Sequence, residues 1–112
     1  MKKGILIVSF GTSHLDTLEK TIAVIEREAA EKFPRAGVYR AFTSSVIIRK
    51  LKRTAGLAVD TVGEALERMA ADGVEEVIVQ PTHIINGIEN DAMMGSLMEH
   101  MGLFRQIRAG KP

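Results

Sequence analysis

The sequence predicts an α/β fold of the three-layer kind, in which helices cover both faces of a mostly parallel four-stranded sheet. Three observations lead to this prediction. Apolar, β-branched segments alternate along the chain with segments of helical periodicity. The first apolar segment, residues 4–10, has no polar alternation, which is typical of a strand buried on both faces. The length of 112 residues suits one domain, and no Pro-, Gly- or Ser-rich linker divides it.

Two strands and two helices are expected in the first half of the chain. After the first strand and a polar turn, a helix is expected over residues 16–33, because Asp16 and Glu19 have the spacing of a capping box. Residues 38–42, which are apolar or aromatic except for Arg40, predict a second strand. A short helix is expected to follow over residues 46–53.

The second half continues the alternation. A helix is expected to begin at Asp60 or Thr61 and to end at Gly73, and Thr61 and Glu64 again have the capping-box spacing. The remaining elements are a strand, a helix and a last strand, expected over residues 76–80, 88–101 and 104–108. Pro81 is expected at the end of the third strand, since proline cannot donate a hydrogen bond to a central strand ladder.

The loops that follow the strands are the first place to look for a ligand site. Ligands of open parallel sheets bind at the carboxyl ends of the strands, where the strand order reverses. This rule selects residues 11–14, 43–45 and 82–89. The first of these loops combines a glycine with hydroxyl residues, which could hold an anion or could simply form a tight turn and a helix cap.

Imidazole and carboxylate groups follow the third strand. His83 lies at its end, and Glu89 and Asp91 lie at the start of the next helix. Such groups could bind a divalent metal or accept protons, but the two carboxylates could equally serve only to complement the helix dipole. His14, beyond the first strand, could be a metal ligand or proton carrier, or an exposed loop histidine.

The composition argues against several classes of partner. A formal net charge of +1, with 4% aromatic residues, gives no reason to bind nucleic acid, and no apolar run is long enough to span a membrane. The basic run from Arg49 to Arg53, with Arg40 nearby, could hold an acidic small molecule or could be a solvated helix face. The absence of cysteine and of a signal cleavage site favours a cytoplasmic protein.

Four segments together resemble the amino-terminal half of the anaerobic cobalt chelatases, the sirohydrochlorin cobaltochelatases. They are IVSFGTS, RAFTS, IIRKL and QPTHIING, at residues 7–13, 40–44, 47–51 and 80–87. The resemblance implies a chelatase-like fold in which two similar α/β lobes enclose a cleft. It also implies ATP-independent insertion of Co(II), the substrate metal, into sirohydrochlorin during anaerobic cobalamin synthesis, with no organic cofactor.

The resemblance carries over to individual residues. It implies that Glu89 and His83 face the cleft as catalytic residues and as metal ligands, whereas His14 lies one place from a histidine found in some relatives. The residues implied to bind the tetrapyrrole belong to the first two loops: Ser9, Phe10, Gly11, Thr12, Ser13, Thr43 and Ser44.

The same resemblance sets the expected domain organisation. Residues 1–112 are expected to form a single lobe, the amino-terminal half of a two-lobed enzyme, that supplies one wall of the cleft. Its partners would be the tetrapyrrole and either the missing carboxyl-terminal lobe or a second copy in a homo-oligomer. Two alternatives stay open: a non-catalytic module that binds tetrapyrrole or metal, and a homodimeric short chelatase.

Overall fold

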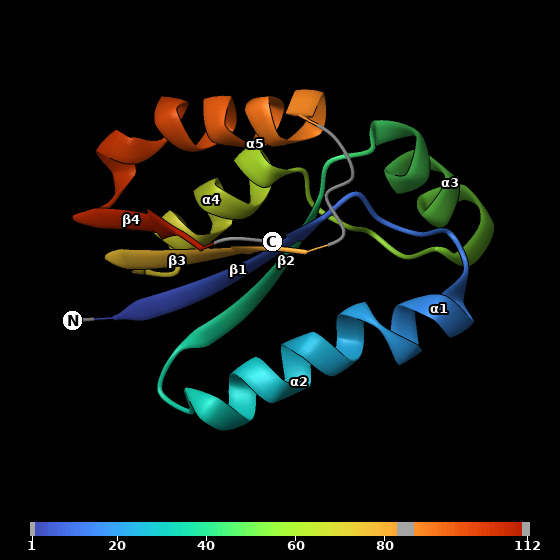
Figure 1. Ribbon diagram of the computed structural model, residues 1–112, viewed down its shortest axis with the longest axis horizontal. Coiled ribbons are helices and arrows are strands. Elements are labelled where there is room, and N and C mark those ends of the chain that lie inside the picture. Colours follow the sequence, from blue (N-terminus) through green and yellow to red (C-terminus); the bar gives the residue numbers. More distant parts are fainter. Residues whose placement is uncertain (1, 83–86, 111–112) are drawn as a thin grey trace.

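The computed structural model describes residues 2–82 and 87–110. Strands and helices alternate as the sequence predicts (Figure 1). The strands are β1 (Lys3–Ser9), β2 (Gly37–Phe42), β3 (Glu76–Pro81) and β4 (Gln106–Ala109). The helices are α1 (Leu15–Lys20), α2 (Ile22–Lys32), α3 (Ser45–Ala55), α4 (Val62–Ala71), α5 (Gly87–Glu99) and the short 3₁₀ helix η1 (Met101–Leu103).

All described strand pairs are parallel, in the order β2-β1-β3-β4. Ile5 of β1 lies between Val38 of β2 and Ile78 of β3. From β1 the chain crosses to β2 on one side of the sheet and then returns to β3 on the other side. The strand order therefore reverses between the carboxyl ends of β1 and β3, which is where an open parallel sheet binds ligands.

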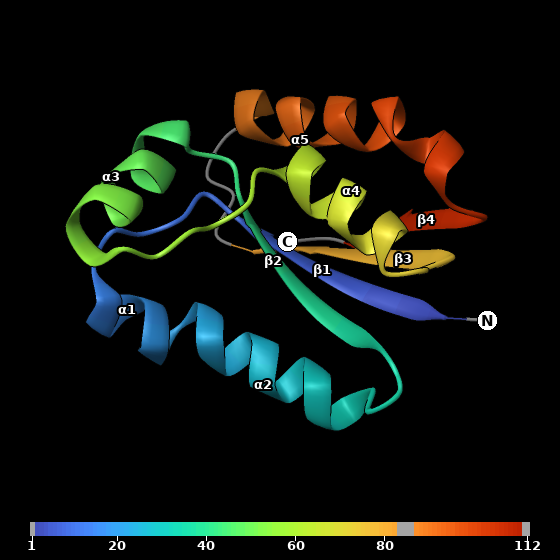
Figure 2. The ribbon, with the colours of Figure 1, turned by 180° about the vertical axis from the view of Figure 1, so that it is seen from behind.

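Helices cover both faces of the sheet, as predicted. Helices α1 and α2 lie on one face and α4 and α5 on the other, while α3 lies beyond the carboxyl ends of the strands (Figures 1 and 2). The six residues of β1 from Gly4 to Ser9 are all buried, because β1 is a central strand with a helix layer above and below it. The α/β fold class is confirmed.

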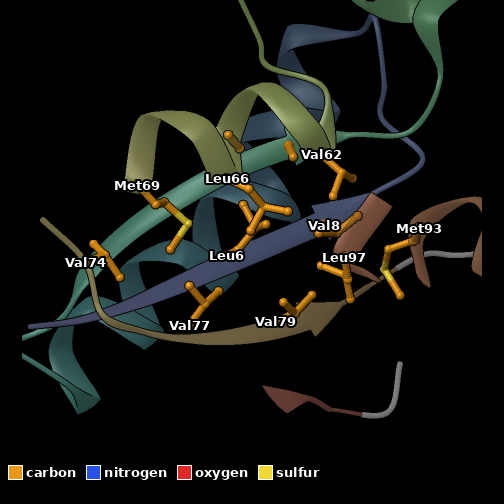
Figure 3. Packing of buried hydrophobic residues seen from close by; sticks show 12 residues of the cluster. Leu6, Val8, Val62, Leu66, Met69, Val74, Val77, Val79, Met93 and Leu97 are labelled. Carbon is orange, nitrogen blue, oxygen red and sulfur yellow. The ribbon is translucent and has the colours of Figure 1, made fainter. Parts of the chain in front are cut away.

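The main core lies between the sheet and the α4–α5 layer (Figure 3). Leu6 and Val8 of β1 and Val79 of β3 point toward α4, where they meet Leu66 and other apolar side chains. A second, smaller cluster on the opposite side holds the carboxyl end of β2 against α1 and α3. Its buried members are Leu18, Ile22, Phe42, Leu51 and Val59.

The single helix predicted over residues 16–33 is wrong in detail, because the chain breaks at Thr21. There the backbone leaves helical geometry, with φ −122° and ψ −80°, and the Thr21 hydroxyl donates a hydrogen bond to the carbonyl oxygen of Thr17 at 2.6 Å. Threonine hydroxyls that bond back in this way bend helices. The predicted capping box is also wrong, since α1 begins one residue earlier and its N-cap, His14, makes no side-chain cap bond.

The second predicted capping box is confirmed. The Thr61 hydroxyl accepts from the Glu64 amide at 3.2 Å, and the Glu64 carboxylate accepts from the Thr61 amide at 2.9 Å. Gly73 follows the end of α4 with φ +86°, a conformation that favours glycine. No helix among the described residues combines the length and apolar character that a membrane span requires.

Candidate functional site

Backbone hydrogen bonds hold the three loops at the carboxyl edge of the sheet together. The Thr43 amide donates to the Ser9 carbonyl at 2.8 Å, and the Ser44 amide donates to the Phe10 carbonyl at 3.1 Å. On the other side of β1, the Thr82 amide donates to a β1 carbonyl at 2.7 Å. The loops after β1, β2 and β3 therefore begin at one place, the edge where the strand order reverses.

Gly11 gives the first loop its close approach to β2. Its φ of +110° is one that residues with a side chain rarely adopt, and a Cβ atom there would lie 2.6 Å from Cδ2 of Phe42. Phe42 is fully buried and closes the second hydrophobic cluster. The backbone at Gly11 thus packs directly on an aromatic ring, which fixes the position of the loop.

Two hydroxyl groups at this edge are buried without a hydrogen-bond partner in the described part of the protein, those of Ser9 and Thr43. Ser9 is only 1% exposed and lines a cavity of about 160 Å³ together with Gly11 and Thr12. Thr43 lines a second cavity of about 240 Å³, between α4 and α5. Buried hydroxyls are normally paired, so these two are unusual in the described part of the chain.

The ionisable residues singled out in the sequence do not all meet at this edge. Glu89 lies in the first turn of α5 and is partly buried, and Asp91, two residues later, is exposed. His14 is exposed and is the N-cap of α1. Helix α1 lies on the opposite face of the sheet from α5 (Figure 1). His83 lies outside the described residues. Within residues 2–82 and 87–110 no three His, Cys, Asp or Glu side chains are grouped to hold a metal ion.

The basic residues singled out in the sequence differ in whether they are paired or exposed. The Arg40 guanidinium donates two hydrogen bonds to the Glu26 carboxylate, at 2.7 and 2.6 Å. These bonds raise the pKa of Arg40 and hold its side chain against α2. Arg49 and Arg53 of α3 are instead exposed, so Arg40 is the basic residue least available to an acidic ligand.

His100, between α5 and η1, is largely buried. Its side chain is 17% exposed, its Nδ1 lies 2.7 Å from the Ser96 carbonyl oxygen, and its Nε2 lies 3.5 Å from a carboxylate oxygen of Glu67. It lines the same cavity as Thr43. Gly63 makes room for the ring, because a Cβ there would lie 3.2 Å from Cε1 of His100. Only the packing of α4 on α5 shows this, so the sequence alone carries no signal for it.

The comparisons with known proteins agree with the resemblance seen in the sequence. A family model described as cobalt chelatase (CbiK) matches residues 3–112. The chain belongs to the cobalt chelatase (CbiK) family. This confirms the family that the four sequence segments predict.

Two curated relatives in this family are both sirohydrochlorin cobaltochelatases. The protein from Salmonella typhimurium (strain LT2) is 44% identical over 112 residues, which are 100% of this chain and 42% of the relative. The CbiKC protein of Nitratidesulfovibrio vulgaris (strain Hildenborough) is 39% identical over 88 residues, 79% of this chain and 30% of the relative. The chain therefore spans less than half the length of the cobalt chelatases that it matches.

Proposed function

We propose that this chain is the amino-terminal lobe of a sirohydrochlorin cobaltochelatase and forms one wall of the cleft in which Co(II) enters the ring. The observation that carries the proposal is the 44% identity to the Salmonella typhimurium cobaltochelatase over all 112 residues. The carboxyl edge, with its converging loops and unpartnered hydroxyls, is the part of the lobe that would face the tetrapyrrole. The reaction would take place in the cytoplasm and would not use ATP or an organic cofactor.

The chemistry assigns different tasks to the residues of this edge. Metal insertion requires the ring to lose its pyrrole protons as the cation loses its water ligands. A carboxylate is a suitable proton acceptor, and Glu89 is the carboxylate that the edge supplies. The hydroxyls of Ser9 and Thr43 would donate hydrogen bonds to the acidic side chains of the ring. His83 would supply an imidazole ligand that holds Co(II) weakly enough to release it.

A single lobe offers few metal ligands. The part of the chain that the structure describes contains no three-residue His, Cys, Asp or Glu group, so firm binding of Co(II) would need His83 together with groups from elsewhere. A second lobe in the longer protein, or a second copy of this chain, would supply them. The tetrapyrrole would then lie between the two walls.

The direct test measures Co(II) insertion into sirohydrochlorin by the change in the ring's absorbance. We expect a rate above the uncatalysed reaction, and we expect Glu89→Gln to lower that rate while the circular dichroism spectrum stays the same. Asp91→Asn is the matched control, because Asp91 lies on the same helix but is exposed. No rate above background, for this chain and for a longer form of the protein, would overturn the enzymatic assignment. Equal rates for Glu89→Gln and Asp91→Asn would remove Glu89 from the mechanism.

A second candidate function is a module that binds the ring without inserting metal. It is favoured by the lack of a three-ligand group in the described residues. Titration of the chain with sirohydrochlorin alone separates the two functions, since binding without subsequent insertion supports the module. Sedimentation shows whether two copies of the 12.3 kDa chain associate to form a complete cleft.

A further inference from the structure

Helix α3 (Ser45–Ala55) carries a concentration of positive charge that the rest of the protein does not share. Its basic residues are Arg49, Lys50, Lys52 and Arg53. Residues 41–59 contain these cations and no Asp or Glu, in a protein whose formal net charge is only +1. The charge is therefore strongly polarised toward this helix.

The basic residues of α3 also differ from several other basic residues in that they form no ion pair in the described part of the chain. Several basic residues elsewhere in the protein form ion pairs with carboxylates: Lys3, Arg27, Arg40 and Arg68. Across the described residues, no carboxylate pairs with a cation of α3. The positive charge of α3 is therefore available to pair with an acidic ligand.

Two of these cations lie on the outward side of the helix. Leu51 is fully buried and anchors α3 to the second hydrophobic cluster. Arg49 and Arg53 each lie two residues from Leu51, about 200° around the helix axis, and both are exposed. Since they are four residues apart, their guanidinium groups emerge side by side on one face.

The helix is fixed beside the carboxyl edge of the sheet. Ser44 caps α3 through a hydrogen bond from the Ile47 amide to its hydroxyl at 3.3 Å, and the Ser44 amide donates to the Phe10 carbonyl of the first loop. Both ribbon views place α3 at the end of the molecule where β1 ends and α5 begins (Figures 1 and 2). The charged helix therefore flanks the same edge as the unpartnered hydroxyls.

The stability of α3 does not account for all of this charge. Cations in the last turn, here Lys52 and Arg53, interact favourably with the helix dipole. Arg49 lies near the middle of the helix, where that effect is weak, and it has no acidic neighbour on α3. Its charge is thus unexplained by the fold.

We infer that the outward face of α3, through Arg49 and Arg53, binds carboxylate side chains of the tetrapyrrole and attracts this polyanion to the cleft. The inference rests on the proposed function and names the residues that recognise the substrate's acidic periphery. A guanidinium group presents paired donors that match a carboxylate, so two of them would orient the ring as well as attract it. Neither residue takes part in proton or metal transfer.

The test is a titration of the 112-residue chain with metal-free sirohydrochlorin, followed by the ring's absorbance. Arg49→Gln with Arg53→Gln should raise Kd about ten-fold, the effect of losing two partly solvated ion pairs. The variant's Kd should also depend less on NaCl concentration than that of the unaltered chain, because salt screens such pairs. Arg49→Lys with Arg53→Lys should restore part of the affinity, since it keeps the charge but not the paired donors.

The matched control removes the same charge from the opposite end of the sheet. Arg35→Gln with Arg105→Gln changes two exposed residues that precede β2 and β4, and it should leave Kd unchanged. Circular dichroism verifies that each variant keeps its helix content. Equal affinity in the α3 and control variants would overturn this inference while the proposed function stands. Absence of ring binding by the unaltered chain would also overturn this inference, whereas the proposed function is decided separately by Co(II) insertion in this chain and in a longer form of the protein.

Discussion

Replacing Gly11 with alanine tests how tightly the loop after β1 is packed. At φ +110° an alanine is strained, and its Cβ would lie 2.6 Å from Cδ2 and 2.8 Å from Cγ of Phe42, where ordinary contacts are 3.4–4 Å. The ring cannot move aside easily, because Phe42 is fully buried within the second hydrophobic cluster. The substitution must therefore distort the loop, the ring or both.

The stability lost in Gly11→Ala can be worked out from the strained backbone and from the close contact with Phe42. A strained backbone conformation costs about 1–3 kcal/mol, and an added methyl group in a well-packed site costs about 1–3 kcal/mol. Gly11→Ala should thus lower the free energy of unfolding by about 2–6 kcal/mol. For a domain of 112 residues, with an unfolding entropy of roughly 2 cal/mol/K per residue, that loss lowers Tm by about 8–25 °C.

Thermal and urea unfolding, followed by far-ultraviolet circular dichroism, measure this loss against two glycine controls. Gly56 has φ +65° with no atom within 4 Å of an added Cβ, so Gly56→Ala should lose only about 1 kcal/mol. Gly95 lies in α5 with equally open space, so Gly95→Ala should gain about 0.5–1 kcal/mol. If Gly11→Ala is no less stable than Gly56→Ala, the proposed packing of the loop on Phe42 is refuted.

Three further predictions concern stability and the choice among basic residues. Burial and the 2.7 Å hydrogen bond to Asp72 raise the pKa of Tyr39 to about 12. The stability that protonated Tyr39 contributes should therefore be complete below pH ~10 and lost as the pH rises through about 12. An absorbance titration of this single tyrosine measures its pKa, and a midpoint near 10 would contradict the prediction. Thr61→Ala removes the capping box and should lower the free energy of unfolding in urea by about 1 kcal/mol, whereas an unchanged midpoint would count against that cap. Arg40→Gln breaks the pair with Glu26 and should lower stability by about 1–3 kcal/mol without changing Kd for sirohydrochlorin, and a weaker Kd would return Arg40 to the site.

The sequence predicts best where a residue's role is decided locally. Residues 4–8 contain no polar side chain because β1 is covered on both faces, so the strand and its central place both follow from composition. Gly56 and Gly73 end their helices with φ +65° and +86°, which is what glycine permits. Pro81 ends β3 at a position without a β4 partner, since β4 pairs only with residues 76–79.

The same local rules fail at the start of α1 and at the break between α1 and α2. Asp16 and Glu19 have the capping-box spacing, just as Thr61 and Glu64 do, but only the second pair forms the box. The two segments differ in where the helix begins, and spacing does not determine that. The break at Thr21 is likewise invisible in the sequence, because it depends on a threonine rotamer that bonds back to the preceding turn.

The direction of side chains limits what the sequence reveals about the site. Tyr39 and Arg40 are neighbours on β2, so their side chains leave opposite faces of the sheet, Tyr39 toward Asp72 after α4 and Arg40 toward Glu26 on α2. Which helix covers which face decides that Arg40 is paired while Arg49 stays unpaired. The sequence predicts both Arg40 and Arg49 as candidates for binding an acidic ligand, and it does not show which of them is paired.

The carboxyl edge contains two kinds of unmet interaction that arise independently. A buried hydroxyl without a partner costs about 1–3 kcal/mol, and the edge has two, on Ser9 and Thr43. The cations of α3 add electrostatic repulsion within one short helix. The unpaired hydroxyls do not stabilise the chain by themselves, and neither does the charge of Arg49 in the middle of α3. Hydroxyl donors and guanidinium groups both complement carboxylates. A ligand rich in carboxylates would supply partners for the α3 cations beside this edge. This is the physical reason to look for the tetrapyrrole here and not in the larger groove beside Arg40 and Arg68, where each cation already has its carboxylate.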